Sequence, residues 1–371
     1  MKRLECLDGL RGALAGYVML SHMAPFVAAP DWVLRPLSHG MAAVDVFFIL
    51  SGMVILGSFD AFGHRMAPFL AARVFRIFPV FLVVFAAAIA IQPLEVAHEM
   101  MPWIAPDSLA GRIWSDGWPA DWAANIGAHL TMTHGLFPDG IWPYVYLGFL
   151  GPAWSLSAEW QFYLLAALCA RQGCEWRLVV GFLGLAALAI VWRYCAPEAW
   201  LFSRAFLPNK AHYFALGMAS TLLLRNGRRD HFAVVLGAVL ALCWVQGGAE
   251  KLAAPLVWTV CLTAQLRQTG VLAPLAAALS SRPLLWLGAV SYCLYLVNEP
   301  AQKLLGVALA RLVAGDAGLF TVLWIPLAVL LPVAVAWWLH RAIEQPVLRW
   351  GKRRRVSASP QPARSMIADT M

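Results

Sequence analysis

Charged residues are scarce in this chain. They account for 13% of its 371 residues, whereas hydrophobic residues account for 61%. A typical soluble domain has about 25% charged residues and about half apolar ones, so this composition excludes an ordinary water-soluble globular protein. Apolar stretches near the length of a bilayer span instead recur from one end of the sequence to the other. The pattern predicts an all-α, polytopic membrane protein, because helices satisfy their own backbone hydrogen bonds in lipid.

Metal-binding cysteine motifs and a cleavable signal peptide are also missing. The cysteines lie mostly inside apolar stretches and show no metal-ligand spacing, so we expect neither a disulfide framework nor a structural zinc. No small-residue cleavage site clearly follows the first apolar stretch, which begins after Asp8, so we expect a retained helix. The net charge of +8 resides in basic loops and the tail, which in a membrane protein indicates orientation rather than nucleic-acid binding.

About ten apolar segments are candidates for transmembrane helices. Their ranges are 9–28, 40–59, 74–92, 151–170, 177–195, 206–224, 232–247, 252–266, 286–310 and 318–340. A further candidate, 123–137, is short and carries Asn125, His129 and His134, so it suits a re-entrant or interfacial segment. We expect one transmembrane domain over residues 1–350 and a basic, disordered tail over 351–371.

The distribution of basic residues predicts the orientation. With ten crossings the arginines and lysines of the short loops fall on one side, and the positive-inside rule places both termini in the cytoplasm. An eleventh crossing would break this pattern. The long loop 93–150 then lies outside, with acidic residues at Glu95, Glu99, Asp107, Asp116, Asp121 and Asp139 against a single Arg112. We interpret its tryptophans, which include Trp103 and Trp114, as interfacial anchors, with a sugar-stacking surface as the alternative.

The first apolar helix carries an arginine and a histidine on one face. Its sequence is LDGLRGALAGYVMLSHM, and Arg11 and His22 are eleven residues apart. At 100° per residue the two side chains lie within about 20° of each other, and at about 1.5 Å per residue His22 lies roughly 16 Å deeper. The spacing suits a buried catalytic imidazole below an anion-binding arginine, or equally a polar pair that only packs helices.

Polar residues also occur in the second and third segments. Asp45 has no local partner, so we expect one on another helix, in either a packing salt bridge or a catalytic pair. Arg73 and Arg76 are three residues apart on one helix face and could bind phosphate or carboxylate, although topological anchoring is the simpler interpretation.

Two later segments complete the set of candidate site residues. PAWSLSAEWQFYLL places Glu159 about two turns into an apolar helix that begins near Trp154, and a membrane-embedded carboxylate is a functional candidate. SYCLYLVNEP carries Tyr292 and Asn298 just before Pro300, which would kink the helix and suits a cavity wall.

Together these stretches resemble the acyltransferase-3 family of integral membrane O-acyltransferases. Arg11 and His22 match its Arg-x10-His signature, and Arg73 and Arg76 match its Arg-x-x-Arg. Further matches are DVFFILSG, WSLSAEWQFYLL, SYCLYLVNEP and the later IEQP at 343–346. The chain departs from the family at Asn298, where a histidine is common. An asparagine can position a group through hydrogen bonds, but it cannot transfer a proton.

The resemblance implies an enzyme of the bacterial inner membrane that acylates sugars, peptidoglycan, antibiotics or lipids. It implies acyl-CoA, acetyl-CoA first, as the donor, held by Arg11, Arg73 and Arg76, and no metal. His22 would be the general base or a transient acyl carrier, with Glu159 or Asp45 orienting the acceptor or the imidazole. Trp154, Tyr292 and Asn298 would bind substrate. The expected acceptor is a hydroxyl of an extracytoplasmic or lipid-linked glycan such as an exopolysaccharide, with polysaccharide-synthesis proteins as candidate partners.

Two other classes of function fit the sequence. A proton-coupled transporter of an anionic solute would use His22, Asp45 and Glu159 as a relay, although we find no internal repeat of the kind common in transporters. A catalytically silent scaffold for polymer synthesis is the third, and the intact Arg11 and His22 argue against it.

Overall fold

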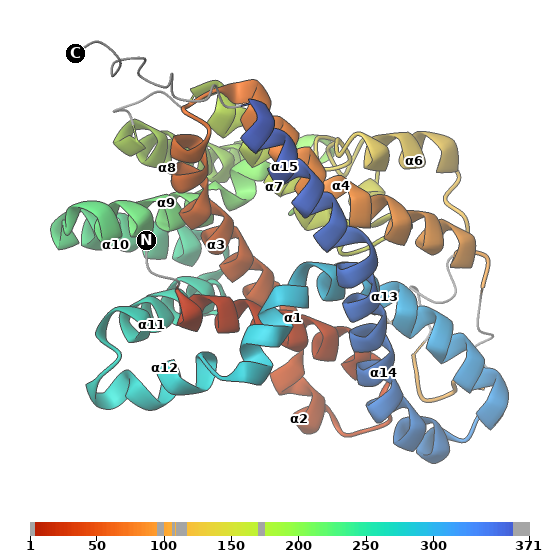
Figure 1. Cartoon of the computed structure of the whole chain (residues 1–371). Helices are drawn as coiled ribbons and strands as arrows, with labels where there is room; N and C mark the ends of the chain where they lie inside the picture. The colour runs from red at the N-terminus through yellow and green to blue at the C-terminus, as the bar shows by residue number, and fades with distance from the viewer. Residues whose placement is uncertain (1–3, 95–99, 106–107, 109–116, 170–174, 359–371) are drawn as a thin grey trace, which may run out of the picture.

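The computed structural model describes residues 4–94, 100–105, 108, 117–169 and 175–358. These residues form helices joined by turns, with no strand beyond one isolated bridge between Pro138 and Phe202. In Figure 1, α1 (Glu5–Met23) and α3 (Gly40–Ala61) lie in the middle of the molecule. The all-helical fold predicted from the apolar segments is therefore confirmed.

The remaining helices flank this centre. One side is formed by α8 (Glu175–Cys195), α9 (Ala211–Asn226), α10 (Arg229–Gly247), α11 (Ala253–Arg267) and α12 (Ala273–Leu279). The other side is formed by α4 (Met66–Ile91), α6 (Trp122–Leu130), α13 (Arg282–Val313) and α14 (Ala317–Leu339). Across the bundle runs α7 (Ala153–Cys169), and a short π-helix, η9 (His340–Glu344), links α14 to α15 (Gln345–Ala358). Short turns include α2 (Asp31–Leu34), η1 (Ala24–Phe26) and η6 (Leu207–Lys210).

Each of the segments expected to span the membrane is occupied by a helix. By length and apolar composition alone, 5 helical units among the described residues could cross a membrane, or 6 if the bent pair α12 and α13 counts as one span. Polytopic membrane character is thus supported, whereas the count of about ten stays a prediction. Helix α6 has 9 residues, or about 14 Å of axial rise, which is too short for a hydrocarbon core of about 30 Å.

Two helices approach closely at glycines. A Cβ atom at Gly12 of α1 would lie 2.3 Å from the carbonyl oxygen of Leu284, and one at Gly288 of α13 would lie 2.1 Å from that of Asp8. Only glycine permits this backbone contact. His22 and Asn298 each follow these glycines by ten residues, so parallel helices in this register bring the two side chains together about 15 Å further along. The pair α3 and α9 is packed in the same way at Gly52 and Gly217.

The long loop 93–150 has a buried polar centre. His129 of α6 and His134 stack with ring centroids 4.0 Å apart, and both are fully buried. Burial lowers the pKa of His134 to about 4, so its imidazole is neutral at pH 7. The pair therefore packs this loop against the bundle, and Glu95, Glu99, Asp107, Arg112, Trp114 and Asp116 of the same loop lie outside the described residues.

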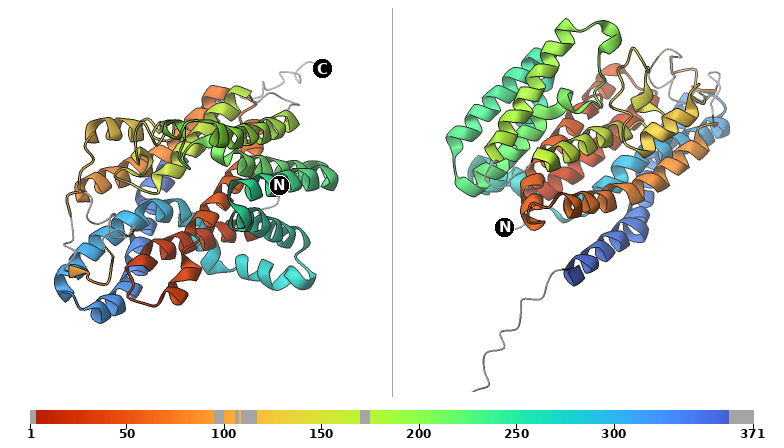
Figure 2. Two further views of the ribbon diagram at one scale, coloured as in Figure 1. Left: turned by 180° about the vertical axis from the view of Figure 1, so that it is seen from behind. Right: turned by 90° about the horizontal axis from the view of Figure 1, so that it is seen from above.

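The C-terminal helix begins before the expected tail and continues into it. Helix α15 runs to Ala358 and projects from the bundle in Figure 2. Residues 351–358 are therefore helical, whereas the tail was expected to be disordered from residue 351, and residues 359–371 lie outside the described part of the chain.

Alanine at Gly12 should destabilise the protein, because its methyl group would collide with the backbone of α13. We expect a loss of about 1–3 kcal/mol, the usual cost of overpacking, and weaker activity. Gly16→Ala is the matched control, since its Cβ would meet only the Leu287 side chain at 3.4 Å. Thermal unfolding in detergent measures the stability of both variants. Equal melting temperatures for the Gly12 and Gly16 variants would contradict the close approach of the two helices.

Candidate active site

A cavity of about 620 Å³ lies at the end of the bundle that carries Arg11, Arg73 and Arg76, which we call the basic end. Helices α1, α3, α4, α7 and α13 supply most of its wall. Its polar lining residues are Asp8, Arg11, Ser51, Ser58, Arg73, Arg76, Ser155, Glu159, Tyr163, Thr221, Ser291, Tyr292 and Tyr295. Five of the residues that the sequence singled out, from four different helices, are thus gathered around one space: Arg11, Arg73, Arg76, Glu159 and Tyr292.

Arg73 is held by a hydroxyl and two aromatic rings. Its Nη2 donates a hydrogen bond to Oγ of Ser58, and its guanidinium carbon lies 5.0 Å from the ring centroid of Tyr163 and 5.2 Å from that of Phe69. Cation–π contacts of this kind orient the planar guanidinium. Arg73 donates to a neutral partner here, so its positive charge is available to an anion in the cavity.

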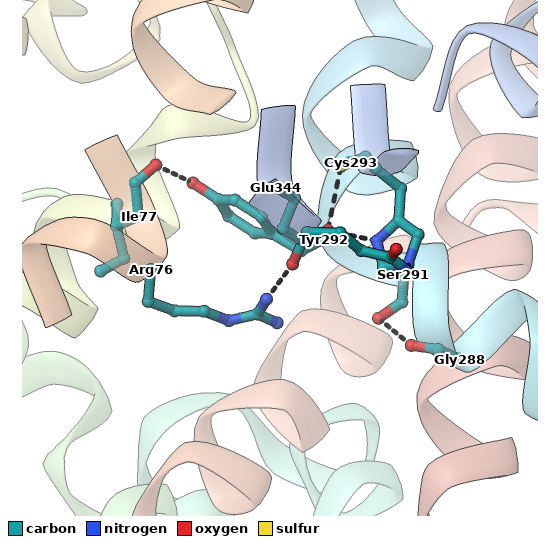
Figure 3. Close-up of polar contacts among 9 residues, drawn as sticks. Arg76, Ile77, Gly288, Ser291, Tyr292, Cys293 and Glu344 are labelled. Atoms are coloured by element: carbon teal, nitrogen blue, oxygen red, sulfur yellow. Dashed lines mark hydrogen bonds and ion pairs between the residues drawn. The ribbon is translucent and has the colours of Figure 1, made fainter. Parts of the chain in front are cut away.

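Arg76 is held by a carboxylate on a distant helix. Its Nη1 donates to Oε1 of Glu344, and its guanidinium carbon lies 5.3 Å from the ring centroid of Tyr292. Figure 3 shows this arrangement, with the Tyr292 hydroxyl donating to the carbonyl oxygen of Ile77. The sequence motif IEQP contains Glu344, but helical spacing alone could not show that it faces Arg76.

Glu159 faces the cavity from α7. Its Oε1 accepts hydrogen bonds from the hydroxyls of Ser51, at 2.5 Å, and Tyr163. Tyr163 also contacts Arg73 through its ring. The carboxylate therefore belongs to the same polar cluster as the arginines.

A pair of hydroxyls lines the inner part of the cavity. Ser155 Oγ and Tyr295 OH lie 2.8 Å apart, and Tyr295 OH also donates to the carbonyl oxygen of Pro152. The cavity wall on α3 extends from Ala61 to Val44, or about 26 Å of helix. The space therefore reaches from the basic end deep into the bundle.

His22 does not line the cavity, but its partner Asn298 lies one helical turn beyond the lining residue Tyr295 on α13. Its Nδ1 is 2.6 Å from Oδ1 of Asn298, whose Nδ2 donates to the backbone oxygens of Leu294 and Tyr295. Because the amide nitrogen is bound to two acceptors, Oδ1 must accept, and Nδ1 of His22 must carry the proton. In the neutral ring, the lone pair that can accept a proton then lies on the other nitrogen, Nε2. Asn298 is fully buried, so the imidazole is turned toward the bundle interior.

Asp45 and Trp154 belong to a separate cluster. Lys210 Nζ lies 2.6 Å from Asp45 Oδ1, and both side chains are buried. The lysine also lies 5.7 Å from the ring centroid of Trp154, while Arg204 lies 5.3 Å from that centroid. The expected partner of Asp45 on another element is thus Lys210 of η6. A lysine within the predicted span 206–224 was the signal that sequence analysis missed.

The possible metal ligands lie elsewhere. One atom each of Cys293, His340 and Glu344 fall within 4.8 Å of one another, and this is the only such group among the described residues. The Glu344 carboxylate of this group is the one that holds Arg76, and Cys293 and His340 both bond to it. The expectation of no metal requirement is not tested by this arrangement.

Sequence comparisons relate this chain to known proteins. The family model described as "Acyltransferase domain" matches residues 4–341. The protein named "Acyltransferase MdmB" from Streptomyces mycarofaciens is 28% identical over 404 residues, which cover 97% of this chain and 96% of that protein. No solved structure matches the chain significantly.

Removing one member of the buried ion pair between Asp45 and Lys210 should destabilise the protein more than removing both members. Asp45→Asn would leave the Lys210 charge buried and unpaired, which costs about 3–5 kcal/mol, whereas Asp45→Leu with Lys210→Met should be nearly neutral. Thermal unfolding and protein yield measure stability, and acyl transfer measures function. A double variant that is stable but inactive would instead give Asp45 or Lys210 a catalytic role.

Proposed function

This chain belongs to the acyltransferase-3 family of membrane O-acyltransferases, and from that premise we propose that it acylates an extracytoplasmic glycan. The donor is acyl-CoA, with acetyl-CoA as the first candidate, and the acceptor is a hydroxyl of a polymer such as an exopolysaccharide. The observation that carries this proposal is the cavity whose wall contains Arg11, Arg73 and Arg76.

The cavity suits a polyanionic donor. Arg11, Arg73 and Arg76 share its wall, and forked guanidiniums bind phosphate oxygens in a bidentate manner. If the basic end faces the cytoplasm, as the positive-inside rule predicts, the cavity opens where acyl-CoA is made. In this role Glu159 balances part of the positive charge and keeps Tyr163 and Ser51 oriented.

The acyl group would reach His22 from the inner part of the cavity. Tyr295 lies one helical turn before Asn298, and its hydroxyl pairs with Ser155 in the inner part of the cavity. In this proposal the acyl group passes this hydroxyl pair to reach the imidazole. The thioester carbonyl would then lie in the middle of the bundle, between a donor on one side and an acceptor on the other.

His22 acts in this proposal as a general base. Its Nε2 takes the proton of the acceptor hydroxyl while the hydroxyl oxygen attacks the thioester carbonyl. The carbon–sulfur bond then breaks, and the same proton passes to the leaving thiolate of CoA. Asn298 keeps the ring in the tautomer that this step requires. Direct attack by Nε2, with a transient acyl-imidazole, is the alternative course.

The transporter alternative finds less support in the contacts. A proton relay requires its members to be connected, whereas His22 bonds to Asn298, Asp45 to Lys210 and Glu159 to Ser51 and Tyr163. The three groups occupy different clusters. Acyl-CoA consumption in membranes separates the two functions, since a transporter shows none.

His22→Ala should reduce acyl transfer by about 10²–10⁴-fold, the usual contribution of a general base. The change is measured as release of free CoA and as acylation of surface glycan by mass spectrometry, at matched protein levels. His39→Ala removes an exposed histidine that does not bond to Asn298 and should leave the rate unchanged. Normal acylation in the His22 variant would refute the proposed mechanism.

Arg73→Ala should raise the KM for acyl-CoA by about tenfold or more, because it removes a charged hydrogen-bond donor from the cavity. The difference in KM between the variant and the wild type should be smaller at high salt, because salt screens the contact between arginine and phosphate. Arg225→Ala is the matched control, since Arg225 pairs with Asp60 and does not line the cavity. An unchanged KM would place the donor elsewhere.

A further inference from the structure

We propose that Glu344 is a positioning residue for the acyl donor, because it fixes Arg76 at the wall of the cavity. The inference rests on the proposed function of that cavity. Neither helical periodicity nor the family comparison assigns a role to Glu344, and the residue lies far from Arg76 in sequence. The argument depends on three contacts to one buried carboxylate.

Three donors converge on Glu344. Its Oε1 accepts from Nη1 of Arg76, while its Oε2 lies 2.7 Å from Nδ1 of His340 and 3.2 Å from Sγ of Cys293. The Glu344 side chain is only 2% exposed. Figure 3 shows the carboxylate between Arg76 and Cys293. A buried carboxylate needs such partners, because an unpaired one would be costly in a medium of low dielectric constant.

The local backbone is unusual at this point. Residues His340–Glu344 form a π-helix between α14 and α15, and single π turns within helices occur frequently at functional sites. The wider turn carries both His340 and Glu344, which bond to each other across it. We interpret the π-helix as the backbone arrangement that presents this carboxylate to α4 and α13.

The pairing leaves most of Arg76 available. A guanidinium has five N–H donors, and the bond to Glu344 uses a donor on Nη1. Arg76 lines the cavity, whereas Glu344 does not. One edge of the guanidinium is therefore anchored in the wall and stacked on Tyr292, while the remaining donors can meet an anionic group. Such preorganisation reduces the entropy that the side chain loses when the donor binds.

A metal ion is the competing explanation for this cluster. Thiolate, imidazole and carboxylate are all ligands of zinc, and the three atoms lie within 4.8 Å of one another. The hydrogen bonds nevertheless satisfy the cluster without an ion. His340 Nδ1 and the Cys293 thiol both donate to Oε2, and Gln345 Nε2 lies 2.9 Å from the other nitrogen of His340. We therefore favour the hydrogen-bonded arrangement and treat a bound metal as an outcome of the test.

A double-mutant cycle tests the proposal in the full-length protein in lipid nanodiscs. Glu344→Gln, Arg76→Ala and the double variant are assayed with acetyl-CoA and the acceptor glycan. We expect each single change to raise the KM for acetyl-CoA about tenfold, with a smaller effect on kcat. The double variant should resemble Arg76→Ala alone, because Glu344 acts through Arg76. Additive effects, or an unchanged KM in Glu344→Gln, would overturn the proposal.

Further variants separate positioning from folding. Glu344→Asp keeps the charge but withdraws it by one methylene, so the cycle can be repeated with it if the glutamine variant is poorly produced. Asp60→Asn breaks a more exposed carboxylate–arginine pair, with Arg225, outside the cavity and should leave the KM unchanged. A kcat loss without a KM change in Glu344→Asp would indicate a different role and refute the inference.

Metal analysis and the wild-type rate complete the test. If the purified wild-type protein contains stoichiometric zinc and Cys293→Ser does not, the cluster is a metal site and the hydrogen-bonded interpretation is wrong. Cys293→Ser with a KM within twofold of wild type and no zinc in either protein supports the proposal. A wild-type protein that consumes no acyl-CoA would refute the proposed function itself, whereas an active wild type with an additive cycle would refute only the role of Glu344.

Discussion

The glycine contact between α1 and α13 is the constraint on which the site depends. Gly12 and Gly288 let two backbones meet without intervening side chains, and the helices then stay in register toward His22 and Asn298. In lipid, such close packing replaces the hydrophobic driving force that water would supply. The imidazole is therefore oriented by an approach that lies about 15 Å away along the helices.

The charges of the cavity are arranged around this frame. Arg73 is held by a hydroxyl and aromatic rings, whereas Arg76 is held by a buried carboxylate. Asp45 and Lys210 neutralise each other in a separate cluster. Since charges inside a membrane protein are costly unless paired or solvated, these differences in pairing indicate which side chains stabilise the bundle and which can meet a ligand.

The sequence predicted the helices and the polar residues they carry, because apolar length and the 3.6-residue period are local properties. It placed Arg11 and His22 on one face and expected a partner for Asp45. It could not name Lys210 or Glu344 as partners, since spacing within one helix does not specify the helix it faces. Lys210 lies inside the predicted span 206–224, and the C-terminal part of α15 has a basic composition that is also typical of a disordered tail.

The hydrogen bond between Asn298 and His22 also restricts how protons can move. With Nδ1 committed to the amide oxygen, a proton can enter or leave the ring only at Nε2. Uptake and release must then occur at the same edge of the imidazole, in succession. If His22 is the general base that we propose, the two reacting molecules meet on one flank of the ring at a single point of proton exchange, and no proton passes across the ring.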